Sequence, residues 1–288
     1  MVFTDLDGTL LDSDTYEWKA AAPALALCRA TRIPVILISS KTRAEMEPLR
    51  KRLGLSGPFV SENGGGVFLP KETFTLPPEG AADAKALALT KPHDGAGISD
   101  LWEIPLGVPY KDLVKALREM RKVLACPVKG FSDMGIEEIS QLTGLNLEEA
   151  RLAQLREYDE PFMVTDDPTA LSPLVRAAEE KGLKVTRGGR FYHLQGNNDK
   201  GEAMTRILAL YTTRYGSVRS MALGDSQNDF SMLQQADFPV LVRSSQDFPS
   251  LVDKIPGLTI TQEAGPAGWN WAVSRLLRKN EEVITRNV

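Results

Sequence analysis

The chain has 288 residues, of which 42% are hydrophobic and 25% charged, a balance typical of a soluble globular protein of about two domains. Its formal net charge of −4 argues against a nucleic-acid partner or an anionic membrane, because both attract proteins with a basic surface. No apolar run approaches the ~20 residues of a membrane span, and the N-terminus resembles a buried strand, so we expect a cytoplasmic protein.

Strand and helix patterns alternate over residues 1–76. Strands are expected at 2–5, in the β-branched run 33–40 and at 58–66, and helices at 17–32 and 42–55, with Gly54 as a stop signal. Residues 65–76 have the pattern of a local hairpin. Such alternation predicts a parallel sheet with right-handed crossovers.

The middle of the chain has a different pattern. Residues 77–100 are rich in Pro, Gly, Ala and Asp, and mark a domain boundary. Helices are expected at 112–124, at 145–158 with a capping box formed by Asn146 and Glu149, and at 171–183. Residues 184–196 predict a hairpin that turns at Gly188-Gly189.

From residue 199 the strand–helix alternation returns, which favours one α/β domain interrupted by an insertion. We predict a catalytic core at 1–80 and 198–288 and an inserted α+β domain at 81–197. The fold class is therefore α/β, a Rossmann-like doubly wound parallel sheet with an inserted α+β domain. Cys28 and Cys126 are interpreted as buried hydrophobic residues.

Four polar segments follow predicted strands or begin predicted helices, and ligands bind at that edge of open parallel sheets. In the first, Asp5 and Asp7 lie two residues apart and can face one site. In the second, Ser39 to Arg43 places hydroxyls and basic residues where a helix begins, a favourable place for phosphate. Taken singly, the first also fits a solvated turn and the second an ordinary helix cap.

The third segment places Lys200 at a helix start, where the helix dipole disfavours a cation, so an anionic partner is expected. The fourth runs from Gly224 to Asp229 and offers hard oxygen ligands suited to Mg²⁺. An exposed surface lysine and a polar loop are the simpler interpretations of these two segments. The presence of all four segments in this order is much stronger evidence for a ligand site than any one segment alone.

The strings "DLDGT" and "GDSQND", with the hydroxyl and the lysine between them, resemble the four motifs of the haloacid dehalogenase superfamily of phosphatases. The resemblance implies that Asp5 is the nucleophile, Asp7 the acid/base and Lys200 the bridge between Asp5 and the phosphoryl oxygens. It implies that Ser39 holds the phosphate, with Ser40 as the alternative. The Mg²⁺ ligands that it implies are Asp5, the carbonyl of Asp7 and Asp225, and it implies that Asn228 and Asp229 support the metal, one of them directly or through water.

The strings "SSKTRAE", "ENGGG", "REYDEPF", "GGRFYHL" and "GPAGWNWAV" resemble the mannosyl-3-phosphoglycerate phosphatase family. The resemblance implies a phosphorylated sugar-glycerate as the small-molecule substrate, mannosylglycerate biosynthesis (a compatible solute), and an inserted cap that selects the leaving group. A glucosyl-3-phosphoglycerate or other sugar phosphatase, a sugar phosphomutase and a non-catalytic regulatory module are the alternatives. Predicted substrate contacts are Ser40, Lys41, Thr42, Arg43, Asn63, Arg156 and Arg190. For Arg156 a solvated helix face, and for Arg190 hairpin packing, remain open.

Overall fold

The computed structural model describes residues 1–85, 100–165, 171–188, 191–246, 248–249 and 253–286. The chain divides into two compact units. Unit 1 comprises 1–39, 57–59 and 199–288, and unit 2 comprises 40–56 and 60–198. Residues 40–56 and 60–80, which the prediction placed in the catalytic core, belong to unit 2 in this division. The predicted boundaries of the insertion at 81 and 197 remain a prediction.

Unit 1 is built on five parallel strands in the order β13-β12-β11-β1-β2. The strands are β1 (Val2–Thr4), β2 (Val35–Ile38), β11 (Met221–Gly224), β12 (Phe238–Arg243) and β13 (Thr259–Ala264). Four of these strands (β1, β2, β11 and β12) consist mainly of apolar residues that are buried, as expected for a parallel sheet covered on both faces.

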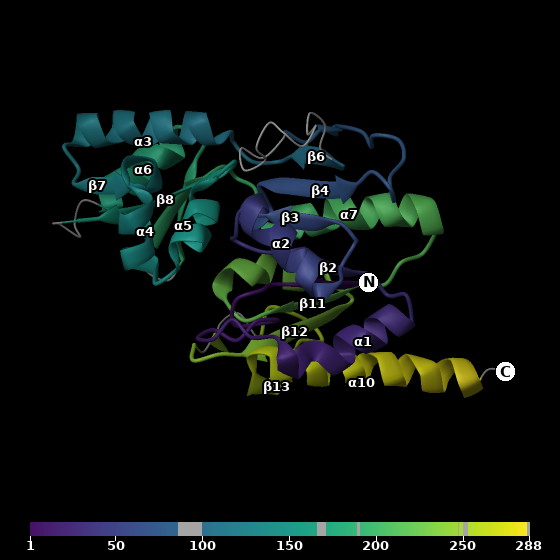
Figure 1. Cartoon of the computed structure of the whole chain (residues 1–288). Coiled ribbons are helices and arrows are strands. Elements are labelled where there is room, and N and C mark those ends of the chain that lie inside the picture. Colours follow the sequence, from purple (N-terminus) through teal and green to yellow (C-terminus); the bar gives the residue numbers. More distant parts are fainter. Residues whose placement is uncertain (86–99, 166–170, 189–190, 247, 250–252, 287–288) are drawn as a thin grey trace. The chain divides into compact units, whose positions relative to one another are not determined.

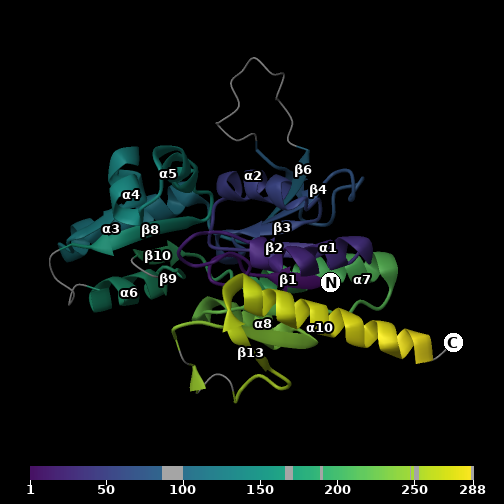
Figure 2. The same ribbon diagram turned by 60° about the horizontal axis from the view of Figure 1, so that its bottom comes forward.

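The helices of unit 1 are α1 (Ala22–Ala30), α7 (Lys200–Tyr215), α8 (Phe230–Gln235) and α10 (Gly265–Arg286). Helices α1 and α10 contact each other and lie side by side in both ribbon views, in purple and yellow (Figures 1 and 2). The first and last helical segments of the chain therefore pack together in this unit.

In unit 2, β4 (Gly66–Pro70), β5 (Ala82–Asp83) and β6 (Leu101–Pro105) form an antiparallel group, and α2 (Arg43–Leu53) belongs to the same unit. The predicted hairpin at 65–76 is wrong, because β4 pairs with β6 instead of with the residues that directly follow it. Strand β3 (Phe59–Ser61) lies at the division, with Phe59 assigned to unit 1.

The rest of unit 2 contains an antiparallel sheet in the order β7-β8-β10-β9, formed by β7 (Val128–Gly130), β8 (Asp159–Val164), β9 (Lys184–Gly188) and β10 (Phe191–Gln195). Its helices are α3 (Tyr110–Leu124), α4 (Ile136–Thr143), α5 (Leu147–Gln154) and α6 (Leu171–Glu180). The predicted pairing of β9 with β10 is confirmed, but the predicted turn residue Gly188 is wrong, because it is the last residue of β9 and pairs with Phe191; Gly189 lies outside the described residues.

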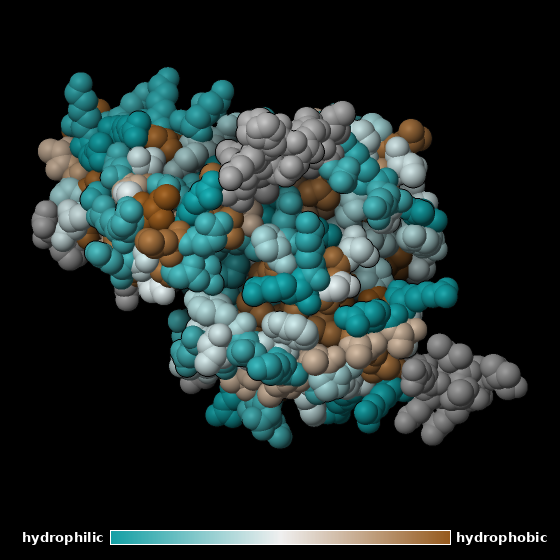
Figure 3. Space-filling model, viewed as in Figure 1, coloured by the Kyte–Doolittle hydropathy of each residue, from teal (hydrophilic) through white to brown (hydrophobic). Residues whose placement is uncertain are grey.

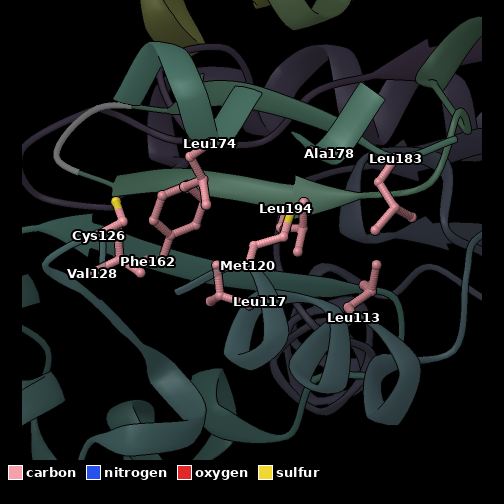
Figure 4. Packing of buried hydrophobic residues seen from close by; sticks show 10 residues of the cluster. All are labelled: Leu113, Leu117, Met120, Cys126, Val128, Phe162, Leu174, Ala178, Leu183 and Leu194. Carbon is pink, nitrogen blue, oxygen red and sulfur yellow. The ribbon is translucent and has the colours of Figure 1, made fainter. Parts of the chain in front are cut away.

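Helix α3 is amphipathic. Leu113, Leu117 and Met120 are buried against Phe162 and Leu194 of the sheet and against α6 (Figure 4). Over α3, the face seen in Figure 3 is mainly hydrophilic. A second buried cluster, formed by Phe131, Met134, Ile139 and Ala150, packs beside α4 and α5.

The predicted fold class, a parallel α/β core with an inserted α+β region, is confirmed. The capping box of Asn146 and Glu149 is also confirmed, although α5 ends at Gln154 rather than at residue 158. Cys28 and Cys126 are both buried, as predicted. Within the described ranges, no helix combines the length and the apolar character that a membrane crossing requires.

Candidate active site

The site lies in unit 1, where β1 and β11 end next to each other. Asp5 directly follows β1, and its backbone N–H donates to the carbonyl of Leu223 in β11 at 2.9 Å. Asp225 directly follows β11. Because parallel strands end at the same edge of their sheet, two acids separated by 220 positions in the sequence meet here.

Lys200 is buried at the first turn of α7, and two carboxylates hold its ammonium group. Its Nζ donates to Oδ1 of Asp5 at 2.7 Å and to Oδ1 of Asp229 at 2.6 Å. The preceding residue, Asp199, caps α7 by accepting from the N–H groups of Gly201 and Glu202. The predicted anionic partner of Lys200 is therefore present within the chain.

Asp229 is fully buried and has hydrogen-bond donors at both carboxylate oxygens. Besides Lys200, the backbone N–H groups of Asp225 and Ser226 each donate to its Oδ2 at 3.0 Å, and the Ser226 hydroxyl donates at 2.9 Å. A Cβ on Gly224 would lie 2.3 Å from the Asp229 side chain, so this approach needs glycine. Asp229 therefore organises the loop and the lysine.

Asp225 is oriented by residues of the string "DLDGT", which follows β1. The Thr9 hydroxyl donates to its Oδ1 at 3.0 Å, and Oδ2 lies 2.6 Å from where a Cβ on Gly8 would be. Gly8 also has a φ of 78°, a conformation that other residues adopt only at a cost in energy. The Ser244 hydroxyl, at the end of β12, donates to the backbone carbonyl of Asp225 at 3.0 Å.

The site carries more negative than positive charge. Burial raises the pKa of Asp5 well above its usual range, against the attraction of Lys200, and the neighbouring acids raise it further. Burial and Asp229 raise the pKa of Asp225 to about 6. Burial opposes the charge on Lys200, but Asp229 and Asp5 outweigh it and raise its pKa.

These acids fit a hard divalent cation. Ligand oxygens of Asp5, Asp225 and Asp229 lie within 4.8 Å of one another, and three carboxylates face one lysine. Oxygen ligands of this kind suit Mg²⁺, which would offset their mutual repulsion. Because donors already occupy both oxygens of Asp229, Asp5 and Asp225 are better placed as direct ligands.

The other predicted residues of this site have distinct environments. Asp7 is partly exposed in the turn after Asp5, and Ser39 is buried directly after β2, the strand that neighbours β1. Asn228 is exposed in the 3₁₀ turn Gln227–Asp229, where its Oδ1 lies beside the same Ser226 hydroxyl that contacts Asp229. Their catalytic and metal-binding roles remain predictions.

The predicted contacts at residues 40–43 and 63 lie in unit 2. The carbonyl of Ser40 accepts from Arg156, and that of Lys41 accepts from the N–H of Glu62. Thr42 caps α2 in a capping box with Glu45. Asn63 is buried with a φ of 53° in the turn Glu62–Gly64.

The two described arginines of the prediction are paired within unit 2. Arg43 is 2% exposed and donates to both carboxylate oxygens of Glu157, at 3.1 and 3.0 Å. Arg156 donates to Oδ2 of the buried Asp159 at 3.4 Å, and the same oxygen lies 2.7 Å from Nδ1 of His193. The solvated helix face considered for Arg156 is wrong, and Arg190 lies outside the described residues.

Sequence reasoning missed the roles of Thr9 and Ser244 in orienting Asp225. Thr9 belongs to "DLDGT", so its position next to the acids was an available signal. Ser244 carries no such signal, because it reaches the loop only when β12 pairs with β11.

The site residues and the fold together indicate one class of protein, the phosphatases that the four motifs resemble. A family model described as haloacid dehalogenase-like hydrolase matches residues 2–86 and 166–248. The chain belongs to this family, and the predicted superfamily is confirmed.

Two relatives narrow the comparison. The chain is 38% identical to a glucosyl-3-phosphoglycerate/mannosyl-3-phosphoglycerate phosphatase of Methanococcoides burtonii, over 98% of this chain and 99% of the relative. It is 35% identical to a protein of the same name from Persephonella marina, over 98% of both. A phosphoric monoester hydrolase is thereby supported.

A solved structure agrees with the fold. The crystal structure of a haloacid dehalogenase-like hydrolase from Bacteroides thetaiotaomicron matches with a TM-score of 0.64 at 18% identity, over 96% of this chain and 98% of that chain. At this identity the match concerns the fold alone.

Proposed function

We propose that the protein is a Mg²⁺-dependent phosphatase that hydrolyses glucosyl- or mannosyl-3-phosphoglycerate to the glycosylglycerate and phosphate. The observation that carries this proposal is the Asp5 carboxylate, held by the buried Lys200 at 2.7 Å beside two further acids. The names of both relatives support the substrate class. We place the reaction in the cytoplasm, in the synthesis of a compatible solute.

In the proposed first step, an Asp5 carboxylate oxygen attacks phosphorus, and the bond between phosphorus and the C3 oxygen of the glycerate breaks. Asp7 gives its proton to that oxygen, so that the alcohol leaves and an aspartyl phosphate remains. Lys200 orients Asp5 and attracts the phosphoryl oxygens, while the Ser39 hydroxyl binds one of them.

In the proposed second step, Asp7 accepts a proton from a water molecule, whose oxygen attacks phosphorus. The bond between phosphorus and Asp5 breaks, phosphate leaves, and Asp5 returns as a carboxylate. Bound Mg²⁺ would neutralise charge between the carboxylates and the phosphate. Among the described acids, Asp5 and Asp225 are the side chains that would hold it, with the Asp7 carbonyl as a further ligand.

A phosphate-release panel with Mg²⁺ tests the function. Mannosyl-3-phosphoglycerate, its glucosyl analogue, mannosylfructose phosphate and hexose phosphates are compared by kcat/KM. We expect the two glycosyl-3-phosphoglycerates to be preferred by at least about tenfold, a difference of about 1.4 kcal/mol in transition-state binding. Equal rates on simple hexose phosphates would refute the substrate, and dependence on a bisphosphate without phosphate release would favour a mutase.

A further inference from the structure

The start of the C-terminal helix α10 contacts the strand that carries Asp5. Trp269, in the string "GPAGWNWAV", is fully buried, and its indole Nε1–H donates to Oγ1 of Thr4 at 2.9 Å. The indole nitrogen can only donate, so Thr4 accepts this bond. The family model ends its match at residue 248, and Trp269 is outside it.

The Thr4 hydroxyl continues the chain of hydrogen bonds to Asp5. Its single proton is donated to the backbone carbonyl of Asp5 at 2.7 Å. Thr4 is fully buried and Asp5 is 6% exposed, so water does not readily replace either bond. A hydroxyl that accepts one bond and donates another is polarised, which strengthens both.

The Asp5 carbonyl needs this support because of its place in the sheet. Strand β1 ends at Thr4, whose register partners are Leu37 in β2 and Leu223 in β11. The N–H of Asp5 still bonds to Leu223, but its carbonyl lies beyond the last paired residue. The hydroxyl of Thr4, held by Trp269, therefore fixes the half of Asp5 that the sheet does not hold.

The neighbours of Trp269 have different contacts. The side-chain oxygen of Asn270 accepts from the N–H of Ala24 at 2.9 Å, and so caps α1, whose own cap residue has no side-chain bond. Trp271 is 38% exposed and lies under the guanidinium group of Arg275. Trp269 therefore contacts the strand that carries Asp5, whereas the contacts of its neighbours Asn270 and Trp271 lie elsewhere, so that these two can serve as control positions.

We propose that Trp269 is a positioning residue for the reaction, acting through Thr4 to hold the backbone of Asp5 so that its carboxylate meets the phosphorus in line. This inference rests on the proposed function, because it concerns the same nucleophile. Positioning errors of about 1 Å reduce rates by up to about 100-fold, so losing one of several constraints should cost about tenfold.

The test compares Trp269→Phe with Trp271→Phe, the same chemical change two positions apart. We expect Trp269→Phe to lower kcat about tenfold while KM stays within about twofold, and Trp271→Phe to leave both near the parent values. Thr4→Val should lower kcat at least as much as Trp269→Phe does. Thr4→Ser keeps the hydroxyl and should therefore retain most of the kcat of the parent protein. The double variant Trp269→Phe/Thr4→Val should be no slower than Thr4→Val alone.

Thermal unfolding of each variant separates positioning from stability. Asn270→Ala should lower the midpoint without changing kcat, because it removes only the cap of α1. Unchanged kcat in folded Trp269→Phe would overturn the inference, and so would an equal loss in Thr4→Ser and Thr4→Val. If Trp269→Phe does not fold, the two Thr4 variants decide the question.

p-Nitrophenyl phosphate serves as a second substrate, since any phosphomonoester reacts at the same carboxylate. If the parent protein hydrolyses it but neither glycosyl-3-phosphoglycerate, the proposed substrate fails while Trp269 is still tested. If the parent protein hydrolyses no phosphomonoester, the proposed function and the inference both fail.

Discussion

Two groups of buried charged residues in this chain are built in opposite ways. In unit 1, Asp5, Asp225 and Asp229 surround a single lysine, which leaves an excess of negative charge. In unit 2, Arg43 is paired with Glu157, and Arg156 with Asp159. The first group is suited to a cation and a reaction, whereas the second pairs each charge with an opposite charge and is suited to holding a structure. Removing a member should therefore reduce activity in the first group and stability in the second.

The largest expected effect is that of Asp5→Asn. The amide cannot attack phosphorus, so phosphate release should fall by more than about a thousandfold. Folding should persist, because Lys200 keeps Asp229 as a partner. Steady-state kinetics and circular dichroism measure the two outcomes. Substantial turnover in a folded variant would exclude Asp5 as the nucleophile.

Removing the metal should also stop turnover, and metal affinity should depend on pH. The pKa of Asp225 is raised to about 6, so below that value a proton must leave before a cation can bind. Apparent Mg²⁺ affinity should fall about tenfold per pH unit below about 6 because of Asp225, and the raised pKa of Asp5 should add a decline of its own. Calorimetric titration measures this, with Asp225→Asn as the comparison. An affinity that is flat across this range would contradict Asp225 as a ligand.

In unit 2, Arg43→Met should lower stability. It leaves the largely buried Glu157 carboxylate without its arginine, and breaking such a pair costs about 3 kcal/mol. Arg52→Met, an exposed change in the same helix, is the control. Urea unfolding gives the difference, and adding Glu157→Gln should recover part of it. A raised KM at unchanged stability would instead make Arg43 the substrate contact that its sequence position predicts.

The smallest expected effect concerns Glu62, fully buried and accepting from the N–H groups of Glu157 and Tyr158. Burial raises its pKa from 4.5 to about 8, so the folded state holds a proton that the unfolded state releases near pH 4.5. Stability from this group is therefore full below pH 4.5 and falls as the pH rises to about 8.

Glu62→Gln removes the titrating carboxyl group and should flatten the decline by about 2 kcal/mol between pH 4.5 and 6. Chemical denaturation across this pH range measures the difference. Glu72→Gln, at an exposed position, is the comparison and should keep the slope of the parent protein. If Glu62→Gln keeps it as well, the buried carboxyl is not the group that titrates.

The sequence predicted the meeting of Asp5, Lys200, Asp225 and Asp229 because that meeting depends on topology. Residues that follow neighbouring parallel strands, or begin the helices beside them, reach one edge whatever the intervening chain does. The pair of Arg43 and Glu157 was missed because it depends on a side-chain contact across 114 positions. The pairing of β4 with β6 was missed for a similar reason, since a local turn signal cannot reveal a partner beyond a long connection.

The grouping of residues 40–56 with 60–198 has a consequence for protein engineering. A chimaera that exchanged only residues 81–197 would carry Glu157 into the new protein and leave Arg43 behind, so each parent would contribute one half of a buried ion pair. The same exchange would separate Glu62 from the backbone groups of Glu157 and Tyr158. Unit 2 is therefore discontinuous as a module for exchange, because it comprises residues 40–56 together with residues 60–198.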